Sequence, residues 1–382
     1  MRVVMAGDFP RKPDEIGGGV EAVTTYLANA LQALPDIELE AVTLDRWGGA
    51  ARSEMQRDVM VHFVPLSRRP SRLSNRQNVH RMSDRIRALA PDLVHAQVAN
   101  QYAAAAKHSG FPWVLTAHGI RHLEMALRPG LLNRYRGAMI RREEFHLMAA
   151  AQHLISISPF ITDVFNAHIS ATTTQIDNPV DGAFFDASRN AQDASLLYVG
   201  RLIPRKDILT LLKAFVMVKE QVPEAELRLA GEGITGLEPT GYPAQMMRFI
   251  EQHGLTEAVT FLGQLDDAAL IAEYEKCSLM VVSSILETAP MVILQAMAAG
   301  VPVVSTDVGG IRYLVEHDSS GAIVAAGDAA ALGREVVAIL KDPEKCLRFG
   351  QHARRLAESR LRASDVAART RDVYVAALQS AS

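Results

Sequence analysis

Short apolar runs alternate with segments of helical periodicity along this 382-residue chain, and that alternation most constrains its fold. The pattern is typical of parallel sheets covered by helices. We therefore predict an α/β protein with two doubly wound, Rossmann-like units in tandem. Expected strands of the first unit lie at residues 3–6, 39–44, 59–64, 93–95, 113–117 and 153–157, with helices such as 20–34 between them. Those of the second lie at residues 196–200, 226–230, 259–263, 279–283, 301–305 and 322–324.

The boundary between the two units is expected where turn residues cluster and periodicity lapses, at residues 178–182 and 186–195. We predict domains at residues 1–180 and 181–362. Residues 361–380 have apolar side chains at helical spacing and predict a last amphipathic helix.

The composition and charge of the chain are those of a folded globular protein. With 48% hydrophobic and 22% charged residues, the chain is that of an ordinary globular protein with real cores. The net charge of -3 is uneven: residues 1–180 hold 20 Lys plus Arg against 17 Asp plus Glu, or +3, which leaves -6 for the remainder. The first half is therefore the side expected to meet an anionic surface.

The chain is expected to work in the cytoplasm. Its two cysteines, Cys277 and Cys346, are predicted core residues and fit a reducing compartment. Residues 1–7 form a strand pattern without the parts of a secretory leader, and no run of about 18 apolar residues could span a bilayer.

Residues 287–304 join an acidic loop, a small-residue helix and a buried strand. Pro290 suits the first turn of a helix, and Gly300 is expected to end that helix before a β-branched strand. Unpaired N–H groups and the helix dipole attract phosphates to such a helix start. An acid beside it, here Glu287, is expected to bind hydroxyl groups.

A second candidate element lies at residues 198–207, where Arg201 follows a strand and Lys206 precedes a helix. Two cations at the carboxyl edge of a parallel sheet can neutralise a diphosphate, although a solvated basic turn is the simpler alternative.

Two weaker features lie in the first half. The glycines at 17–19, including Gly18 and Gly19, allow close backbone approach to a ligand, or form a plain strand-to-helix turn. They match neither the dinucleotide fingerprint nor the phosphate loop. His118 ends an expected strand, where a histidine is more often structural than catalytic.

Together, these motifs resemble the retaining glycosyltransferases of the GT-B fold, glycosyltransferase family four. In that family two glutamates flank seven residues and a Gly-x-Pro-Val-Val follows; here the positions are Glu287 and Gln295, followed by residues 300–304. Residues 200–206 match the family's Gly-Arg-x-x-x-x-Lys element, and smaller matches extend through residues 157–158, 178–181, 230–233, 261–263, 306–310, 321 and 327–328.

The resemblance implies two Rossmann-like domains facing across a cleft, with a carboxyl-terminal helix, residues 363–382, crossing back to the first. The first domain would face the acceptor and the second would hold the nucleotide-sugar donor. The implied catalytic residues are His118, as a sugar contact, Arg201 and Lys206 on the leaving diphosphate, and Glu287. The implied donor-binding residues are Gly18, Gly19, Gly231, Gly233, Gly263, Leu265, Ala289, Met291, Val292 and Gln295.

The chain departs from the family at two positions. Pro290 removes a backbone donor from the loop where the family commonly has Glu-Gly-Phe-Gly. At Gln295 an amide replaces the acid that normally accepts from the ribose hydroxyls. One hydrogen bond between the Gln295 amide and a ribose hydroxyl can persist, and the expected loss in nucleotide binding free energy is roughly 1 kcal/mol.

No metal or other cofactor is expected beyond the nucleotide diphosphate co-substrate. The chain has no Asp-x-Asp at a strand end, and its His, Cys, Asp and Glu residues lack ligand spacing. Arg201, Lys206 and helix amino termini would stabilise the developing diphosphate charge instead.

Two basic segments in the first half allow different interpretations. Residues 68–87 contain seven arginines and are expected to be a solvated helix preceded by a loop through Pro70 and Ser74. In residues 132–142, Leu132, Tyr135 and Met139 alternate with Arg134, Arg136, Arg141 and Arg142. That segment predicts an amphipathic surface helix that lies on anionic lipid or binds a lipid-phosphate acceptor. The acids Glu143 and Glu144 reduce its positive charge and argue against both. Nucleic-acid binding is not expected, because aromatic residues are sparse there.

The sequence thus predicts a metal-independent, retaining glycosyltransferase that moves a sugar from a nucleotide diphosphate donor to a glycan or polyprenyl-linked acceptor. The resemblance places such enzymes in cell-envelope or exopolysaccharide synthesis, in the cytoplasm or peripherally on the inner membrane face. A nucleotide-sugar epimerase of the same fold and a noncatalytic nucleotide-sugar sensor remain alternatives.

Overall fold

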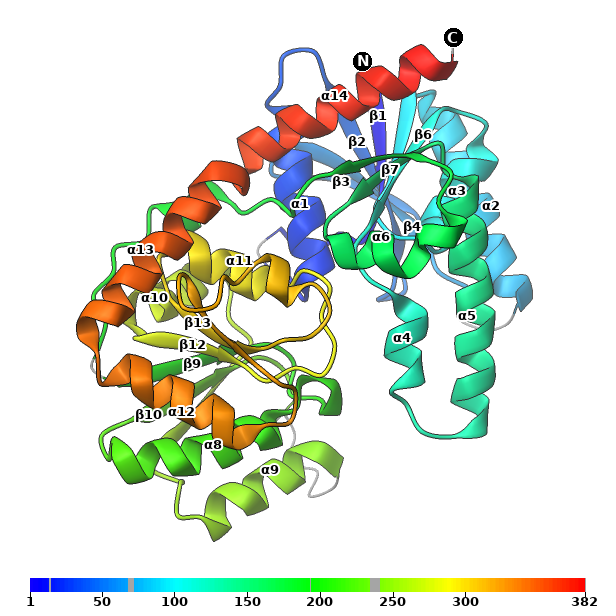
Figure 1. Ribbon diagram of the computed structural model, residues 1–382. Helices are drawn as coiled ribbons and strands as arrows, with labels where there is room; N and C mark the ends of the chain where they lie inside the picture. Colours follow the sequence, from blue (N-terminus) through cyan, green and yellow to red (C-terminus); the bar gives the residue numbers. More distant parts are fainter. Residues whose placement is uncertain (14, 68–71, 193, 234–240, 382) are drawn as a thin grey trace. The chain divides into compact units, whose positions relative to one another are not determined.

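The computed structural model describes residues 1–13, 15–67, 72–192, 194–233 and 241–381, without the side chains of residues 72–74. The described chain divides by its internal contacts into two compact units. Unit 1 comprises Met1–Pro179 and Ala363–Ser382, and unit 2 comprises Val180–Arg362. The predicted boundary at residues 180 and 181 lies one residue beyond this division. Figure 1 shows the sheets and helices of each unit.

Unit 1 is built on an eight-stranded sheet with the order β3-β4-β2-β1-β5-β6-β7-β8. All neighbouring strands are parallel except β3, which pairs antiparallel with β4. Its strands are β1 (Arg2–Ala6), β2 (Glu38–Asp45), β3 (Arg52–Gln56), β4 (Val59–Pro65), β5 (Leu93–Ala96), β6 (Trp113–Ala117), β7 (His153–Ser156) and β8 (Thr172–Gln175). Its helices are α1 (Gly19–Gln32), α2 (Arg72–Leu89), α3 (Gln101–Ser109), α4 (Arg121–Ala126), α5 (Leu131–Ala150), α6 (Pro159–Phe165), the 3-10 helix η1 (Asn166–His168) and α14 (Ala363–Ala381).

Unit 2 is built on a six-stranded parallel sheet with the order β11-β10-β9-β12-β13-β14. Its strands are β9 (Ser195–Val199), β10 (Glu226–Ala230), β11 (Val259–Gly263), β12 (Leu279–Val282), β13 (Val303–Thr306) and β14 (Gly321–Val324). Its helices are α7 (Gly182–Phe185), α8 (Ile208–Gln221), α9 (Gly241–Gln252), α10 (Asp267–Lys276), α11 (Met291–Ala298), α12 (Ala329–Leu340) and α13 (Pro343–Arg360), with 3-10 turns η2 (Pro204–Lys206) and η3 (Ile311–Tyr313). Both units are Rossmann-like, as predicted.

The strand order reverses once in each sheet, and the reversal determines where a ligand can bind. In unit 1, β1 lies between β2 and β5; in unit 2, β9 lies between β10 and β12. Within each sheet the loops that leave the two neighbouring strands, β1 and β5 or β9 and β12, therefore diverge to opposite sides. A crevice at such a switch point, outside the carboxyl ends of the strands, is the usual ligand position in open α/β sheets.

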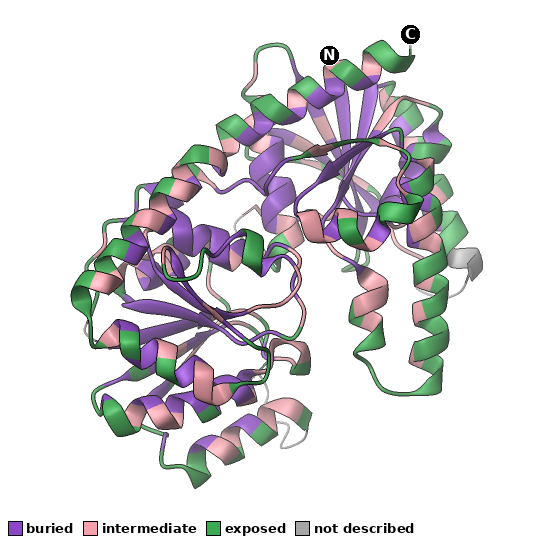
Figure 2. Ribbon diagram, viewed as in Figure 1, coloured by how far each residue is buried: buried purple, intermediate pink, exposed green. Residues whose placement is uncertain are grey.

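The carboxyl-terminal helix α14 belongs to the core of unit 1. Val366, Val373, Tyr374 and Ala377 are buried on it and join the apolar cluster that includes Leu27 of α1. Figure 2 shows the buried strands of both sheets. The expected return of the last helix to the first domain is therefore observed, although that helix starts at Ala363 rather than residue 361.

Several local predictions were wrong. The edge strands β3 and β8 were missed, because their sequences are polar and exposed positions at a sheet edge carry no apolar signal. Pro290 lies just before α11 as its N-cap residue, not inside the first turn. Helix α2 begins at Arg72, so Ser74 lies in a helix rather than in the predicted loop. Residues 68–71, with Pro70, lie outside the described residues.

The cysteines are both free, and only Cys277 is fully buried. Cys346, on α13, is partly buried and packs against the apolar core of unit 2.

Candidate functional site

In unit 2 one predicted cation, Lys206, meets the predicted acid, Glu287, at the β9 switch point, together with Arg205, which was not predicted as a site residue. Lys206 ends η2, just after β9, and Glu287 lies in the loop after β12. The Lys206 ammonium donates to the Glu287 carboxylate at 2.5 Å, and the Arg205 guanidinium lies 3.8 Å from the second carboxylate oxygen. Ser284 donates to Glu287 at 2.7 Å. The Glu287 side chain is only 8% exposed, so these contacts replace its water.

The Glu287 carboxylate is charged within this cluster. Burial would raise the pKa of Glu287, but the positive charges of Lys206 and Arg205 and the hydrogen bonds from Lys206 and Ser284 outweigh it and lower the pKa. The cluster is thus a fixed set of charges, with two nearly buried cations around one carboxylate.

Hydrogen bonds fasten η2 to the loop that follows β12, and that loop to the one that follows β13. The N–H of Ile285 donates to the carbonyl of Arg205 at 2.9 Å, and the Arg205 side chain donates to the carbonyl of Leu286 at 2.9 Å. The hydroxyl of Ser283 donates to the carbonyl of Lys206 at 2.9 Å. The N–H of Gly310 donates to the carbonyl of Glu287 at 3.1 Å. The segments that carry the charged side chains are therefore fixed to one another by hydrogen bonds.

The predicted glycines of unit 2 lie beside this cluster. Gly231 follows β10 with φ of 141°, and a Cβ atom there would lie 2.0 Å from the carbonyl oxygen of Gly200. Gly233 has φ of 137°, and a Cβ atom there would lie 2.9 Å from the Cβ atom of Leu202. The N–H of Gly231 donates to the carbonyl of Gly263, the last residue of β11, at 2.7 Å. The ends of β9, β10 and β11 therefore meet at one edge, and Arg201 is exposed there.

The remaining predicted donor-binding residues of unit 2 flank that edge. Leu265 follows β11 and is partly buried, whereas Ala289 and Met291 are buried at the start of α11. Val292 is half-buried, and its carbonyl accepts from the Tyr274 hydroxyl at 2.9 Å. Gln295 is 4% exposed on the next turn of α11.

In unit 1, His118 follows β6 and belongs to a buried chain of hydrogen bonds. Its Nε2 atom lies 2.6 Å from the Gln97 side-chain oxygen, which can only accept, so Nε2 carries the proton. The Gln97 amide in turn donates to the ring of His95 at 3.2 Å. His95 contacts the Tyr374 hydroxyl and the Thr116 hydroxyl, each at 2.6 Å.

This arrangement leaves His118 neutral with one lone pair unused. Burial lowers the pKa of His118 to about 4, although a hydrogen bond with the Asn178 side chain acts to raise it, and burial lowers the pKa of His95 to about 3. Within the described part of the chain, the Nδ1 atom of His118 has no hydrogen-bond partner. A buried acceptor of this kind can take a hydroxyl hydrogen from a ligand.

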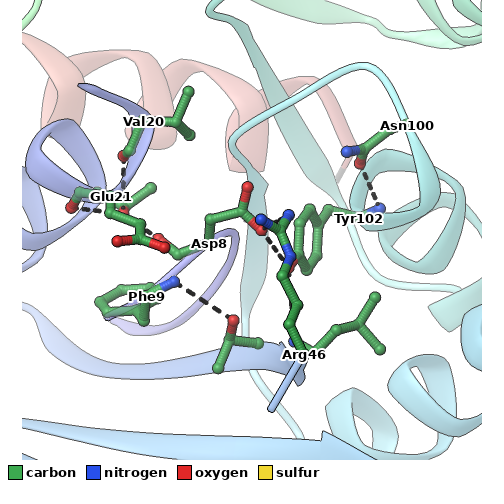
Figure 3. A network of polar contacts seen from close by, with 10 residues as sticks. Asp8, Phe9, Val20, Glu21, Arg46, Asn100 and Tyr102 are labelled. Carbon is green, nitrogen blue, oxygen red and sulfur yellow. Dashed lines mark hydrogen bonds and ion pairs between the residues drawn. The ribbon is translucent and has the colours of Figure 1, made fainter. Parts of the chain in front are cut away.

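The β1 switch point of unit 1 carries a second polar network (Figure 3). The Asp8 carboxylate accepts from the Tyr102 hydroxyl and from the Arg46 guanidinium, each at 2.5 Å. The glycine loop follows: Glu21 accepts from the N–H of Gly17 at 2.7 Å, and Gly18 is the N-cap residue of α1, which begins at Gly19. Gly18 has extended backbone, and a Cβ atom there would meet no atom within 4 Å.

The motifs identified only part of these two clusters. The residues not singled out are Arg205 and Ser284 of unit 2 and Gln97, Tyr374 and Arg46 of unit 1, although Ser284 and Gln97 each follow a strand and so carried a detectable signal. Tyr374 is distant in sequence and carried none. Within the described residues, no group of three or more His, Cys, Asp or Glu side chains could hold a metal ion. A surface hollow of about 340 Å³ lined by Met1, Pro35 and Asp92 lies at the amino edge of the unit 1 sheet, away from these groups.

Two Rossmann-like units, each with a polar cluster at its switch point, fit the GT-B glycosyltransferase class, and comparison with known proteins shows that class. The family descriptions "Glycosyl transferases group 1" and "Glycosyltransferase Family 4" match residues 181–356 and 17–183. The chain is 31% identical over 304 residues to a glycogen synthase of Mycobacterium tuberculosis, covering 76% of this chain and 70% of the relative. The chain therefore belongs to the group 1, family 4 glycosyltransferases and is a glycosyltransferase enzyme.

Solved structures support the same fold at lower identity. Sucrose-phosphate synthase from Thermosynechococcus elongatus has a TM-score of 0.83 and 21% identity, with 100% of both chains covered. Anabaena HepE in complex with UDP and glucose has a TM-score of 0.76 and 19% identity, covering 98% of this chain and 99% of that one.

Proposed function

We propose that the protein transfers a sugar, with retention of anomeric configuration and without a metal ion, from a nucleotide diphosphate sugar to a glycan or polyprenyl-linked acceptor. The observation that carries the proposal is the buried cluster of Arg205, Lys206 and Glu287, with Arg201 at the same sheet edge. Three cations less one carboxylate leave a formal charge of +2, which suits a diphosphate.

The roles follow from the chemistry of each group. The bond from the anomeric carbon to the diphosphate breaks with its electron pair on the phosphate oxygen, and Arg201 and Lys206 stabilise that charge. The acceptor hydroxyl bonds to the same face of the carbon, and its proton passes to the leaving phosphate. Glu287 holds Lys206 in place and accepts from sugar hydroxyls, and the Nδ1 lone pair of His118 accepts another.

The nucleotide is proposed to be bound by unit 2, mostly through backbone groups near Gly231, Gly233 and Gly263. HepE, which shares the fold, was solved with UDP and glucose, so a uridine nucleotide is the first candidate to test. Gln295 would form one hydrogen bond with a ribose hydroxyl, because its amide can accept or donate.

We place this reaction in cell-envelope or exopolysaccharide synthesis in the cytoplasm, on or near the inner membrane face. The two free cysteines are consistent with a reducing compartment. No helix among the described residues is long and apolar enough to cross a membrane.

Binding of nucleotides in the presence of EDTA tests the site. One of UDP, GDP or ADP should raise the melting temperature, because a ligand at 100 times its Kd stabilises the fold by about 2.7 kcal/mol. Lys206→Ala should weaken the binding of that nucleotide at least tenfold, whereas Lys213→Ala, at an exposed position on α8, should leave its affinity unchanged. Binding that requires a divalent cation would contradict the metal-free part of the proposal.

Product analysis tests the reaction. The donor sugar should be consumed only with an acceptor present, and NMR should find the anomeric configuration of the donor in the product. Rearrangement of the donor without acceptor would identify an epimerase instead. Nucleotide binding without turnover for any acceptor pool would favour a sensor.

A further inference from the structure

The helices α4 and α5 form a hairpin (Figure 1), and much of α5 is exposed (Figure 2). Its large apolar side chains lie in water: Leu131 is 81% exposed, Leu132 61%, Tyr135 59% and Met139 37%. Leu127, in the connection between the two helices, is 44% exposed. Single exposed apolar residues are common on proteins, but a contiguous group on one helix marks an interaction surface.

These side chains form a stripe that points away from the partner helix. At about 100° per residue, Leu131, Tyr135 and Met139 fall within about 80° of one another on α5. Gly137 lies on the other side, where a Cβ atom would be 3.5 Å from the Met125 side chain of α4. Helix α5 therefore has one face on α4 and a second apolar face directed outward.

Hydrogen bonds and an ion pair fix the base of the hairpin, so the fold itself determines which face of α5 points outward. The buried carboxylate of Glu144 accepts from the N–H groups of Arg121 and His122 at 2.8 and 3.1 Å, and from the His122 ring at 2.7 Å. Glu143 pairs with the Arg121 guanidinium at 3.3 Å. The two acids that would dilute the basic charge are thus used inside the hairpin.

The rest of the hairpin is strongly positive. Arg121 aside, because it pairs with Glu143, residues 122–142 contain five arginines and one acid, Glu124, or +4. Arg136 and Arg142 lie close to the apolar stripe by helical position, and both are exposed. The arginines of α2 differ, because Arg85 contacts His62 at 2.7 Å and Arg87 pairs with Asp84 at 2.6 Å.

We propose that this face of the α4–α5 hairpin docks on a lipid bilayer that contains anionic headgroups, with the apolar stripe at the level of the acyl boundary. An apolar stripe flanked by arginines is the arrangement of helices that lie in the membrane interface. The charge decides against a second copy of the chain, since each copy would bring the same five arginines of residues 128–142 into the contact. A bilayer supplies negative charge and an apolar layer together. This docking goes beyond the proposed sugar transfer and needs no substrate.

Vesicle flotation without nucleotide or acceptor tests the proposal. The protein should float with vesicles containing phosphatidylglycerol and much less with pure phosphatidylcholine, and added salt should release it. Arg136→Gln with Arg142→Gln should weaken the partition coefficient about fivefold per arginine. Leu131→Gln with Leu132→Gln should weaken it about tenfold or more.

The matched control is Leu347→Gln with Arg355→Gln, which changes an exposed leucine and an exposed arginine on α13 of unit 2. This variant should bind vesicles as the unchanged protein does, and all variants should keep the same melting temperature. As a second readout, the fluorescence of Leu132→Trp should shift to shorter wavelength with anionic vesicles.

Three results would overturn the proposal. One is equal flotation with neutral and anionic vesicles, and another is no flotation at low salt. The third is a dimer in solution that Leu131→Gln with Leu132→Gln dissociates, because that result would assign the face to a second copy.

Discussion

At the scale of single residues, the most consequential group is the Glu287 carboxylate. It is nearly buried, it accepts from Lys206 and Ser284, and it neutralises part of a cationic cluster. A buried pair of this kind adds little net stability relative to apolar packing, but removal of one partner leaves the other charge without compensation.

Glu287→Gln is therefore expected to lower the free energy of unfolding by about 3 kcal/mol at pH 7. It should lower kcat/KM by about 100-fold, the size typical for loss of one preorganised electrostatic group. Urea unfolding and initial rates measure the two effects. Glu251→Gln, at an exposed site on α9, is the control and should change neither.

The same variant tests the charge state. Because the folded protein lowers the pKa of Glu287, its stabilisation is present above the ordinary value of 4.5 and is lost as pH falls through the lower folded value. The stability difference between the protein and Glu287→Gln should shrink as the pH falls below 4.5. A difference that stays constant down to pH 3 would show that the carboxylate is not stabilised as described.

Gly231 illustrates a residue fixed by close backbone approach. Gly231→Ala would force a side chain into positive φ and place its Cβ 2.0 Å from the Gly200 carbonyl oxygen. We expect a loss of about 3 kcal/mol in unfolding free energy. Gly254→Ala, with φ of 64° and no atom within 4 Å, should cost only about 1 kcal/mol. Equal losses in chemical denaturation would mean that the contact with Gly200 is not limiting.

At the scale of elements, α14 connects the last residues of the chain to the candidate site. Its Tyr374 hydroxyl bonds to His95, and Gln97 lies between His95 and His118. The helix thus contributes both apolar packing to unit 1 and one end of the buried chain that orients His118.

Tyr374→Phe is expected to lower the unfolding free energy by about 1–2 kcal/mol, because it removes the shorter of the two hydrogen bonds at the Nδ1 atom of His95. It should also lower kcat several-fold with little change in nucleotide affinity, since the nucleotide is assigned to unit 2. Ser380→Ala, which removes an exposed hydroxyl of the same helix, should leave both unchanged. A loss of stability with normal kcat would confine Tyr374 to a structural role.

At the scale of the whole molecule, two buried neutral histidines should make stability depend on pH. The folded protein lowers the pKa of His118 to about 4 and of His95 to about 3, whereas the unfolded chain protonates both below the ordinary value of 6.5. The unfolded state then binds more protons, so stability is full above pH 6.5 and falls as pH is lowered toward 4.

Each histidine contributes a slope of up to about 1.4 kcal/mol per pH unit in that range. Urea unfolding of the protein and of His118→Asn between pH 7 and 4.5 measures the slopes. The variant should show the smaller slope, and equal slopes would contradict the assignment of a neutral His118.

The architecture and part of the site follow from the sequence alone. Buried parallel strands are apolar runs, so most strands of both sheets were predicted, and so was the α/β class. Arg201, Lys206, Glu287 and His118 were singled out because ligand-binding positions in parallel sheets lie just after strands, a local property of the chain, and their roles remain predictions. The polar edge strands β3 and β8 had no such signal.

Only the tertiary structure decided which of these residues meet and in what state. The short contact of Lys206 with Glu287 joins residues 81 positions apart, and that of His95 with Tyr374 joins residues 279 apart. Burial, which requires the complete fold, lowers the histidine pKa values and leaves the α5 stripe outside any core. Local patterns specify strands and helices, but charge pairing and desolvation depend on neighbours that are distant in sequence, so they arise only when the chain has folded.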